Sequence, residues 1–497
     1  MGTPNNKNSA AVIAVDIGTS GCRADLLNCR GEVLTSAAQT YTYQCTPENG
    51  FAEQDPEQVL EAFIAVVQNA ASGYSGRISF IVIDSVMHSL VLVDNAGIPL
   101  TPLSIWADTR ATIQCSTSST VHHQHAWHRK TGCPLSPSYP LSRLQWYRDN
   151  QQSIFSRLHK AVSIKSYILF RIFGLWIEDH SVASATGLFN LHERRWDDEI
   201  VQHLQISTEH LPAPVPVEYR IPAAYSSFGR NANLPEEATW VIGGGDGPMA
   251  HLGTAGYNND HASLTIGTSS AVRVLSSREH AGKNVDAWTY LLDNCHAVSG
   301  IASNNGGNVL EYYVRSLLKM NDDWTVLDAG LTECRPDRKL FCFPYLFKER
   351  TATAPLGLSG FLGVKPSHSQ IDLLRATVEG IIFHVLLMFE KLTCNLKIHA
   401  LALSGSMTQL VAVQKMITEL LDVSVYRMPG LLAPQRGSVS LIPGIEGKGQ
   451  RMFSRKTCPS GLLDKYNDWC NLRTLHQSES SEHQLREAVG QSSKVGD

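Results

Sequence analysis

One short structural device occurs twice in this sequence. Residues 12–28 read VIAVDIGTSGCRADLLN and residues 263–275 read SLTIGTSSAVRVL, so both contain an apolar run, the letters Ile-Gly-Thr-Ser and a second apolar run. A supersecondary unit that recurs about half a chain length away indicates a duplicated domain. We therefore expect two related domains, each of which begins with a strand, a turn of small residues and another strand.

Size and composition limit the function classes that fit the chain. Its 497 residues are enough for two or three domains. A formal net charge of −4 gives no basic field for nucleic acid or an anionic membrane, which favours a small-molecule ligand. The 11 cysteines never form a CxxC pair, and the longest apolar stretch is shorter than the ~20 residues of a membrane span. We expect a cytoplasmic protein with reduced thiols and no membrane partner.

Short β-branched runs alternate with helical patterns along the chain. Residues 11–18 and 78–86 have the pattern of strands, and residues 56–72 carry apolar side chains at helical spacing. The second half repeats the alternation and includes a long helical pattern at 370–392. This order of elements predicts an α/β fold with two related lobes facing each other across a cleft.

The two repeated turns consist of glycine, threonine and serine. Such turns expose main-chain N–H groups and hydroxyls with no bulky side chain in the way, so phosphate oxygens can approach closely. Ordinary hairpins use the same residues, and that interpretation stays open for either turn alone. The sequence contains no GxxxxGK[ST] that would indicate a Walker-type loop. The candidate phosphate-binding residues are Gly18, Thr19, Ser20, Gly267, Thr268 and Ser269.

Two aspartates are candidates for chemistry. Asp16 ends the first apolar run directly before its turn, where a carboxylate could hold Mg²⁺ directly or through water, or simply cap the strand. Asp246 lies in the glycine-dense loop GGGDGPMAHLG, where it could accept the proton of a substrate hydroxyl. The alternative for that loop is a tight turn without function.

The segment between these aspartates offers side chains for a polyol. A polyol needs hydrogen-bond donors and acceptors and a flat apolar wall. A guanidinium would suit a substrate carboxylate, which singles out Arg110. Buried structural roles are the alternative, above all for methionine and tryptophan. The candidates are Met87, His88, Trp106, Asp108 and Arg110.

Two further patterns resemble metal sites but lack the accompanying ligands. The segment HHQHAWH contains His122, His123, His125 and His128, yet no HExxH or cysteine pair goes with it, so we expect a solvated loop or helix face. The spacing of Cys22 and Cys29 matches no metal motif, and we assign it no function.

From about residue 11 to about residue 445, the chain resembles the FGGY carbohydrate kinases. SYPLSRLQWYRDN, at 138–150, is similar to the first family signature, with Arg143 where lysine is usual. The stretch 359–379 fits the second signature throughout. The resemblance implies two ribonuclease-H-like domains of the actin and hexokinase type around a central cleft. The domains expected are a disordered lead-in at 1–10, an N-terminal domain at 11–250, a C-terminal nucleotide-binding domain at 251–450 and a polar extension at 451–497 that decorates the fold.

The resemblance also implies roles for the candidate residues. The two Gly-Thr-Ser turns match the family's phosphate motifs, and 401–425 matches its adenosine motif, which adds Gly405 and Ser406. Asp246 matches the catalytic base and Asp16 the magnesium-associated aspartate. ATP and Mg²⁺ are thus the implied cofactors, a small-molecule sugar or sugar acid is the implied partner, and a homodimer is compatible with it.

Within the family, several stretches look most like gluconate kinases, among them SIKSYILFRIFG and SNNGGNVLEYY. This subgroup implies transfer of the γ-phosphate of ATP to D-gluconate. The alternatives are a xylulokinase-like or other polyol kinase, and a catalytically impaired sugar- and nucleotide-binding sensor. The sensor is suggested by departures in the adenosine region: Ser404 where glycine is common, Glu419 where aspartate is usual, and the unusual helix start after Pro429. The loop KERTATAPLGLSGF is also more apolar than its usual counterpart.

Overall fold

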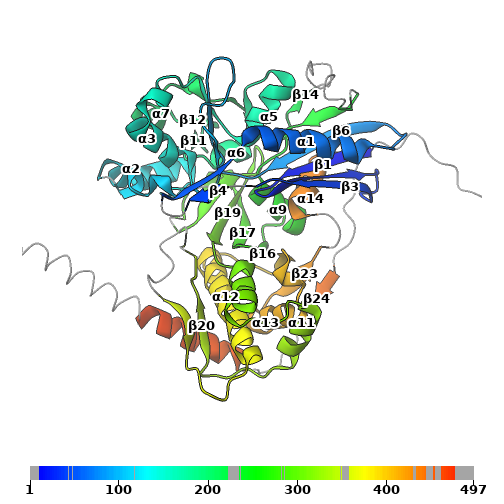
Figure 1. Cartoon of the computed structure of the whole chain (residues 1–497), viewed down its shortest axis with the longest axis vertical. Coiled ribbons are helices and arrows are strands. Elements are labelled where there is room, and N and C mark those ends of the chain that lie inside the picture. Colours follow the sequence, from blue (N-terminus) through cyan, green and yellow to red (C-terminus); the bar gives the residue numbers. More distant parts are fainter. Residues whose placement is uncertain are drawn as a thin grey trace, which may run out of the picture. The chain divides into compact units, whose positions relative to one another are not determined.

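The chain divides into two compact units, each described by itself (Figure 1). Unit 1 contains Met1–Asn259, Val274–Gly300 and Met428–Gln450, and unit 2 contains Asp260–Arg273, Ile301–Arg427 and Arg451–Asp497. Three stretches of the expected C-terminal domain, 251–259, 274–300 and 428–450, thus belong to unit 1. The computed structural model describes residues 11–42, 44–46, 49–116, 118–221, 234–235, 237–280, 282–284, 286–347, 349, 358–428, 432–443, 451–453 and 461–475.

A six-stranded mixed sheet forms the centre of unit 1. Its order is β14-β15-β6-β1-β2-β3, in which β1, β2 and β3 are antiparallel while β6 and β15 run parallel to β1. The expected strand, turn and strand at the start of the chain are therefore confirmed. The strands are β1 (Ala11–Ile17), β2 (Gly21–Leu27), β3 (Val33–Thr40), β6 (Ile78–Ser85), β14 (Arg220–Ile221) and β15 (Thr239–Val241).

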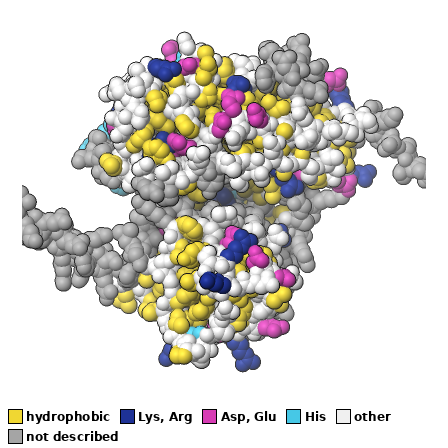
Figure 2. All heavy atoms as spheres, in the orientation of Figure 1, with side chains coloured by type: hydrophobic (Ala, Val, Ile, Leu, Met, Phe, Trp, Pro, Cys, Tyr) yellow, Lys and Arg dark blue, Asp and Glu magenta, His cyan; other side chains and the backbone are white. Residues whose placement is uncertain are grey.

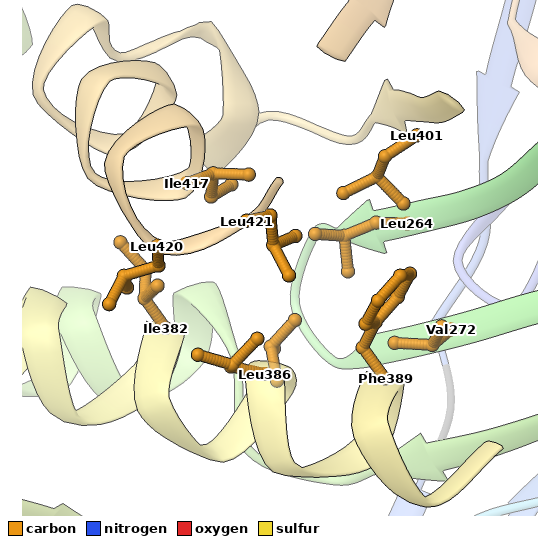
Figure 3. Close-up of a pocket in the computed structure, with 10 residues that line it drawn as sticks. Leu264, Val272, Ile382, Leu386, Phe389, Leu401, Ile417, Leu420 and Leu421 are labelled. Atoms are coloured by element: carbon orange, nitrogen blue, oxygen red, sulfur yellow. The ribbon is translucent and has the colours of Figure 1, made fainter. Parts of the chain in front are cut away.

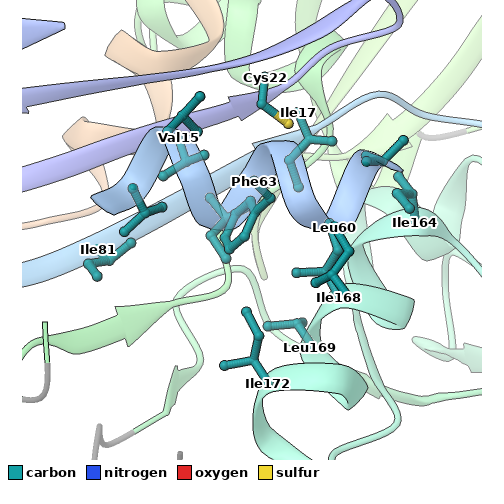
Figure 4. Close-up of a cluster of buried hydrophobic side chains, with 14 of the residues drawn as sticks. Val15, Ile17, Cys22, Leu60, Phe63, Ile81, Ile164, Ile168, Leu169 and Ile172 are labelled. Atoms are coloured by element: carbon teal, nitrogen blue, oxygen red, sulfur yellow. The ribbon is translucent and has the colours of Figure 1, made fainter. Parts of the chain in front are cut away.

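Helices cover both faces of this sheet, because its central strands are apolar on both sides. Val15 and Ile17 of β1 point to the face that α1 (Pro56–Ala71) and α5 (Ile164–Phe173) cover, where Phe63 packs (Figure 4). The alternate residues Val12 and Ala14 face α14 (Ala433–Ser440). The period of two along a strand therefore decides which residues share a face with α14.

Two helices on the α14 side approach each other at backbone distance. A Cβ on Gly253 of α9 (Asp246–Ala255) would lie 1.9 Å from the carbonyl oxygen of Ala433, and one on Gly437 would lie 2.0 Å from that of Met249. Only glycine permits this approach. The contact explains why α14, which follows the strands of the second sheet up to β23 in the sequence, belongs to unit 1.

Smaller elements complete unit 1. They surround the central sheet and include three two-stranded pairings and one three-stranded sheet. They are β4 (Gln44–Thr46), β5 (Phe51–Gln54), β7 (Val91–Val93), β8 (Leu103–Ser104), α2 (Ser118–Thr131), α3 (Pro140–Asn150), α4 (Gln152–Phe155), β9 (Lys160–Val162), β10 (Ile177–Asp179), α6 (His180–Ser184), β11 (Phe189–Asn190), β12 (Arg195–Trp196), α7 (Asp198–His203) and β13 (Ala213–Val215).

The second large sheet repeats the plan of the first. Its order is β18-β19-β17-β16-β22-β23-β24, with β16 and β17 joined by the second Gly-Thr-Ser turn and β22 parallel to β16 and β23. The duplication expected from the sequence is thus present in the strand order. The strands are β16 (His261–Ile266), β17 (Ser270–Ser277), β18 (Trp288–Leu291), β19 (His296–Ser303), β22 (Ala400–Ser404), β23 (Ser424–Arg427) and β24 (Arg451–Phe453).

An apolar core holds unit 2 together. Leu264 and Leu401 of the sheet meet Ile382 and Leu386 of α12 (Gln370–Thr393) and Ile417 of α13 (Val411–Leu420), and these side chains line a small apolar pocket (Figure 3). The pocket is part of the core, since leucine, isoleucine, valine and phenylalanine are its lining residues. The further elements are α10 (Gly307–Tyr312), a π-helix (Tyr313–Leu317), α11 (Trp324–Glu333), β20 (Phe341–Pro344) and β21 (Ser359–Leu362).

The C-terminal extension contributes to the core of unit 2. Residues 462–475 form a helix, and its Trp469 is fully buried and donates from Nε1 to the carbonyl oxygen of Cys342 (3.0 Å). Lys465 of the same helix forms a buried ion pair with Glu379. This part of the extension is therefore structural, whereas a decorating tail was expected. The lead-in 1–10 and residues 476–497 lie outside the described residues.

On the face shown in Figure 2, acidic and basic side chains are interspersed rather than segregated. Within the described part of the chain, no helix has the length and apolar character needed to cross a membrane.

Candidate active site

The first Gly-Thr-Ser turn is held by side chains from outside the hairpin. Gly18 N donates to the carbonyl oxygen of Gly21 (3.0 Å), which closes the turn. Gln54 Nε2 donates to the carbonyl oxygen of Thr19 (2.6 Å), and Trp106 Nε1 donates to its Oγ1 (2.9 Å). Trp106, a predicted substrate residue, thus also braces the predicted phosphate turn, while Ser20 is exposed.

The second turn lies among glycines of unit 2. Gly307 N donates to the carbonyl oxygen of Gly267 (2.7 Å), and a Cβ on Gly306 would lie 2.7 Å from the carbonyl carbon of Ser269. Gly405 has a φ of +91° and would place a Cβ 2.4 Å from the carbonyl oxygen of Ile266. A Cβ on Gly267 itself would meet open space. The turn is therefore packed against backbone on one side and open on the other, as a phosphate-binding turn requires.

The unusual Ser404 fits this arrangement. Its Oγ lies 2.8 Å from Thr265 Oγ1, which also accepts from Arg273 Nη1 (2.8 Å). The left-handed residue is the next one, Gly405, so a serine at 404 causes no strain. Ser406 precedes a short 3₁₀ turn, and Thr408 Oγ1 donates to the carbonyl oxygen of Gly405 (2.8 Å).

Asp16 has a partner that the sequence analysis missed. Asp84 is its register partner on the parallel strand β6, and the two carboxyl groups share a hydrogen bond. Asp84 also accepts from Ser438 Oγ of α14 (3.2 Å). Burial raises the pKa of Asp16 to about 6 and raises that of Asp84 well above its usual range. The pair is a site where a nearby positive charge would be strongly stabilised.

Asp246 is the first residue of α9, and its charge acts on both members of this pair. Like-charge interaction with Asp246 adds to the rise in pKa of Asp16 and Asp84. The carboxylate accepts from Gly247 N (2.8 Å), and its place in the first turn suits the helix dipole. Three carboxylates thus occur together in unit 1, two of them predicted from the sequence.

The acidic pair fits a hard cation. Asp16 Oδ1 and Asp84 Oδ1 are enclosed and have no hydrogen-bond partner. Mg²⁺ prefers carboxylate, water and phosphate oxygens and keeps several waters. Across the residues that the structure describes, no three His, Cys, Asp or Glu side chains form a complete metal cage. An ion here would therefore need water or phosphate oxygens to complete its coordination.

Met87 and His88 lie beside the Asp246 loop and a pair of tyrosines. A Cβ on Gly245 would collide with Met87, so this methionine packs against the loop. The ring of His88 meets Tyr139 and Tyr290 edge to face, at 5.0 and 5.6 Å between centroids, and the two tyrosine hydroxyls lie 2.8 Å apart. Aromatic rings and hydroxyls thus lie together beside the loop that carries Asp246.

His88 is held in an uncommon conformation by a buried arginine. Its φ is +62°, which is rare for a residue with a side chain, and its Nδ1 lies 2.8 Å from the carbonyl oxygen of Ala185. Arg143 donates to the carbonyl oxygens of His88 and Ser138 and to Ser104 Oγ. The arginine at the position of the usual signature lysine therefore fixes the backbone at His88.

Asp108 and Arg110 form a buried ion pair. Arg110 Nη2 donates to Asp108 Oδ2 (2.7 Å), and the same guanidinium also contacts Glu53 and Tyr147 Oη (3.0 Å). Its carbon lies 3.9 Å from the centre of the Phe51 ring, and its side chain is 2% exposed. These contacts favour a supporting role for Arg110, since a substrate carboxylate would have to displace one of them.

The histidine segment and the pair Cys22 and Cys29, which match no metal motif, lie on ordinary helix and strand elements or in turns. The histidine segment belongs to α2, where His122 and His125 are exposed, as expected. His128 is instead buried, with Nε2 3.0 Å from the carbonyl oxygen of Ala287, and burial lowers its pKa. Cys22 is buried on β2, and Cys29 is exposed.

The structure brings most predicted residues of unit 1 together, and three others join them. Asp84, Tyr139 and Tyr290 were missed. Asp84 had a readable signal, because it ends an apolar strand just as Asp16 does. No feature of the sequence pointed to Tyr290, since its place beside His88 depends on tertiary structure.

Comparisons with known proteins show the family of this chain. Residues 11–253 match the N-terminal domain, and residues 262–440 the C-terminal domain, of the FGGY family of carbohydrate kinases. A gluconokinase of Bacillus subtilis (strain 168) is 30% identical over 394 residues, 77% of each chain. A xylulose kinase of Staphylococcus xylosus is 24% identical over 382 residues, 76% of this chain and 78% of its own. The crystal structure of gluconate kinase from Lactobacillus acidophilus superposes with a TM-score of 0.84 at 24% identity, covering 96% of this chain and 100% of that one.

Proposed function

Because this chain belongs to the FGGY family of carbohydrate kinases, and so is a sugar phosphotransferase of the two-domain actin and hexokinase type, we propose that it phosphorylates D-gluconate with ATP. The observation that carries the chemistry is the acidic group Asp16, Asp84 and Asp246 near a Gly-Thr-Ser turn. Gluconate is favoured over xylulose by the greater identity to the gluconokinase of Bacillus subtilis.

Asp246 is the proposed base. At the start of α9 it is half-buried, and a carboxylate there can accept the proton of a substrate hydroxyl as phosphoryl transfer begins. The hydroxyl oxygen then attacks the γ-phosphorus, and ADP leaves. Positioning and electrostatics supply most of the rate in such reactions.

The acidic pair and the turns have complementary roles in this proposal. Asp16 and Asp84 would hold Mg²⁺ through their unpartnered oxygens and bound water. When bound, the ion offsets the negative charge of the phosphates. The main-chain amides of Thr19 and Ser20 and those of Thr268 and Ser269 would hold phosphate oxygens, while the amides of Gly18 and Gly267 close the two turns. Gly405 and Ser406 would lie on the nucleoside side.

The sugar side consists of the rings and hydroxyls near Asp246. His88, Tyr139 and Tyr290 would donate to or accept from substrate hydroxyls, with Met87 and Trp106 as apolar walls. Asp108 and Arg110 would support this wall through the buried ion pair. We also propose a cytoplasmic location, because ATP is abundant there and the ten described cysteines are all free.

ADP release with Mg-ATP, measured for gluconate, xylulose, ribulose, glycerol and fuculose, tests the proposal. Selective turnover of gluconate is expected, with a fall of about 10²–10⁴-fold in Asp246→Asn and no loss of melting temperature. Preference for xylulose would reassign the substrate. Absence of turnover on every sugar would overturn the proposal of a gluconate kinase.

A further inference from the structure

Lys165 is a fully buried lysine on α5. Its ammonium donates to Asp179 Oδ2 (2.7 Å), to the carbonyl oxygen of Gly244 (2.8 Å) and to that of Ile242 (3.1 Å). An ammonium has three donors, and each of them has a partner here. Two of the three partners belong to the loop that leads directly into Asp246.

That loop is held from its other sides as well. Gly243 has a φ of +64°, and a Cβ on it would lie 1.8 Å from the carbonyl oxygen of Ile83. Ser85 N donates to the carbonyl oxygen of Gly244 (3.2 Å), and Gly245 N donates to Ser181 Oγ (3.2 Å). The loop thus presses against β6, and its carbonyls at 242 and 244 both turn toward Lys165.

The anchor of Lys165 is itself rigid. Asp179 uses its second oxygen, Oδ1, to accept from Val182 N (2.8 Å) and so caps α6. The same short helix provides Ser181, which holds Gly245. A buried ion pair is seldom retained for stability alone, because desolvation offsets much of the attraction between the charges.

We infer that Lys165 is a positioning residue for Asp246, an inference that rests on the proposed function. By tying the carbonyls of Ile242 and Gly244 to Asp179, it sets where α9 begins and where the Asp246 carboxylate lies. It contacts neither sugar-side nor phosphate-side candidates through these three bonds, so its loss displaces the base without removing a substrate contact. Misplacement of a reacting group by about 1 Å can cost ~10²-fold in rate.

Lys165→Met tests this inference, with Lys465→Met as the matched control. Both lysines are buried in ion pairs, but Lys465 pairs with Glu379 in unit 2. We expect kcat to fall ~10- to 100-fold in Lys165→Met, with KM for gluconate and ATP changed less than about threefold. Amide hydrogen exchange at 242–250 should accelerate in Lys165→Met and not in folded Lys465→Met.

Ser181→Ala keeps the test decisive if Lys165→Met does not fold. It removes one hydrogen bond to Gly245, so a smaller fall in kcat and faster exchange at 242–250 are expected. Unchanged kcat or unchanged exchange in the folded variants would overturn the inference. A wild-type protein without kinase activity would instead overturn the proposed function, while the exchange data still decide whether Lys165 restrains the loop.

Discussion

Asp16 and Asp84 are register partners on the parallel strands β1 and β6, with carboxyl groups on the face of the sheet that α14 covers. Two carboxylates side by side in a buried place destabilise the fold when both are charged. Such an arrangement persists where a cation is needed, since a bound cation offsets the repulsion.

Replacing Asp84 separates stability from activity. We expect Asp84→Asn to raise the free energy of unfolding by about 1–3 kcal/mol at pH 8 without Mg²⁺, because it removes a carboxyl group whose charged form is disfavoured by burial and by the neighbouring Asp16. Turnover with Mg-ATP should fall at least about tenfold, with a higher Mg²⁺ requirement. Thermal melts and Mg²⁺ titrations of kcat check both. Ser438→Ala, which removes only the hydrogen bond to Asp84, should leave the Mg²⁺ requirement unchanged.

The conformation of the second Gly-Thr-Ser turn depends on the close approach of Gly405 to Ile266. In Gly405→Ala, the methyl group would collide with the carbonyl oxygen of Ile266, so the turn must shift, and we expect KM for ATP to rise at least about tenfold. Gly360→Ala is the control, because Gly360 also has a positive φ, +114°, but open space around its Cβ position. Equal ATP kinetics in the two variants would argue against a role of the turn in nucleotide binding.

The role of Arg110 can be tested by comparing the binding of gluconate with that of neutral polyols. Arg110→Ala leaves Asp108 buried without its main partner, so we expect a loss of about 3–5 kcal/mol of unfolding free energy. Binding of gluconate and of neutral polyols should weaken to a similar extent, as measured by calorimetry. Weakening confined to sugar acids would instead assign the guanidinium to the substrate carboxylate, as predicted from the sequence.

Glu178 makes stability depend on pH. Burial raises its pKa to about 8, so the folded state keeps a proton that the unfolded state loses above its ordinary value of 4.5. The contribution of Glu178 to the free energy of unfolding is fully present below pH 4.5. It is lost as the pH rises from there through 8, by up to about 1.4 kcal/mol per pH unit. Glu178→Gln should therefore flatten the decline of melting temperature between pH 5 and pH 9, roughly the window of this shift. Glu379→Gln, at an ion-paired glutamate, should melt lower at every pH.

Trp469 tests the role of the C-terminal helix. Trp469→Ala should reduce the free energy of unfolding by about 3–5 kcal/mol, because it empties a fully buried site and removes the hydrogen bond to Cys342. Leu475→Ala on the same helix, at a residue 62% exposed, should change it by less than about 0.5 kcal/mol. Denaturant unfolding of the two variants measures both free energies. Equal effects would mean that the helix packs only loosely on unit 2.

The sequence alone predicted the duplicated hairpins, the α/β class and the family. These are local features, because apolar periodicity and glycine-rich turns depend on residues close together in the chain. The same locality made Asp16 and Asp246 recognisable, each at the end of an apolar run or in a glycine-rich loop.

The tertiary structure decided which side chains that are distant in the sequence lie next to one another. The partnership of Asp16 with Asp84 depends on strand register, and that of His88 with Tyr290 depends on a segment about 200 residues away returning to unit 1. The polar composition of 462–475 concealed a helix with one buried face, because a lysine such as Lys465 can be buried when an acidic partner lies beside it. Local pattern therefore determined the elements and their chemistry, while long-range packing determined their partners.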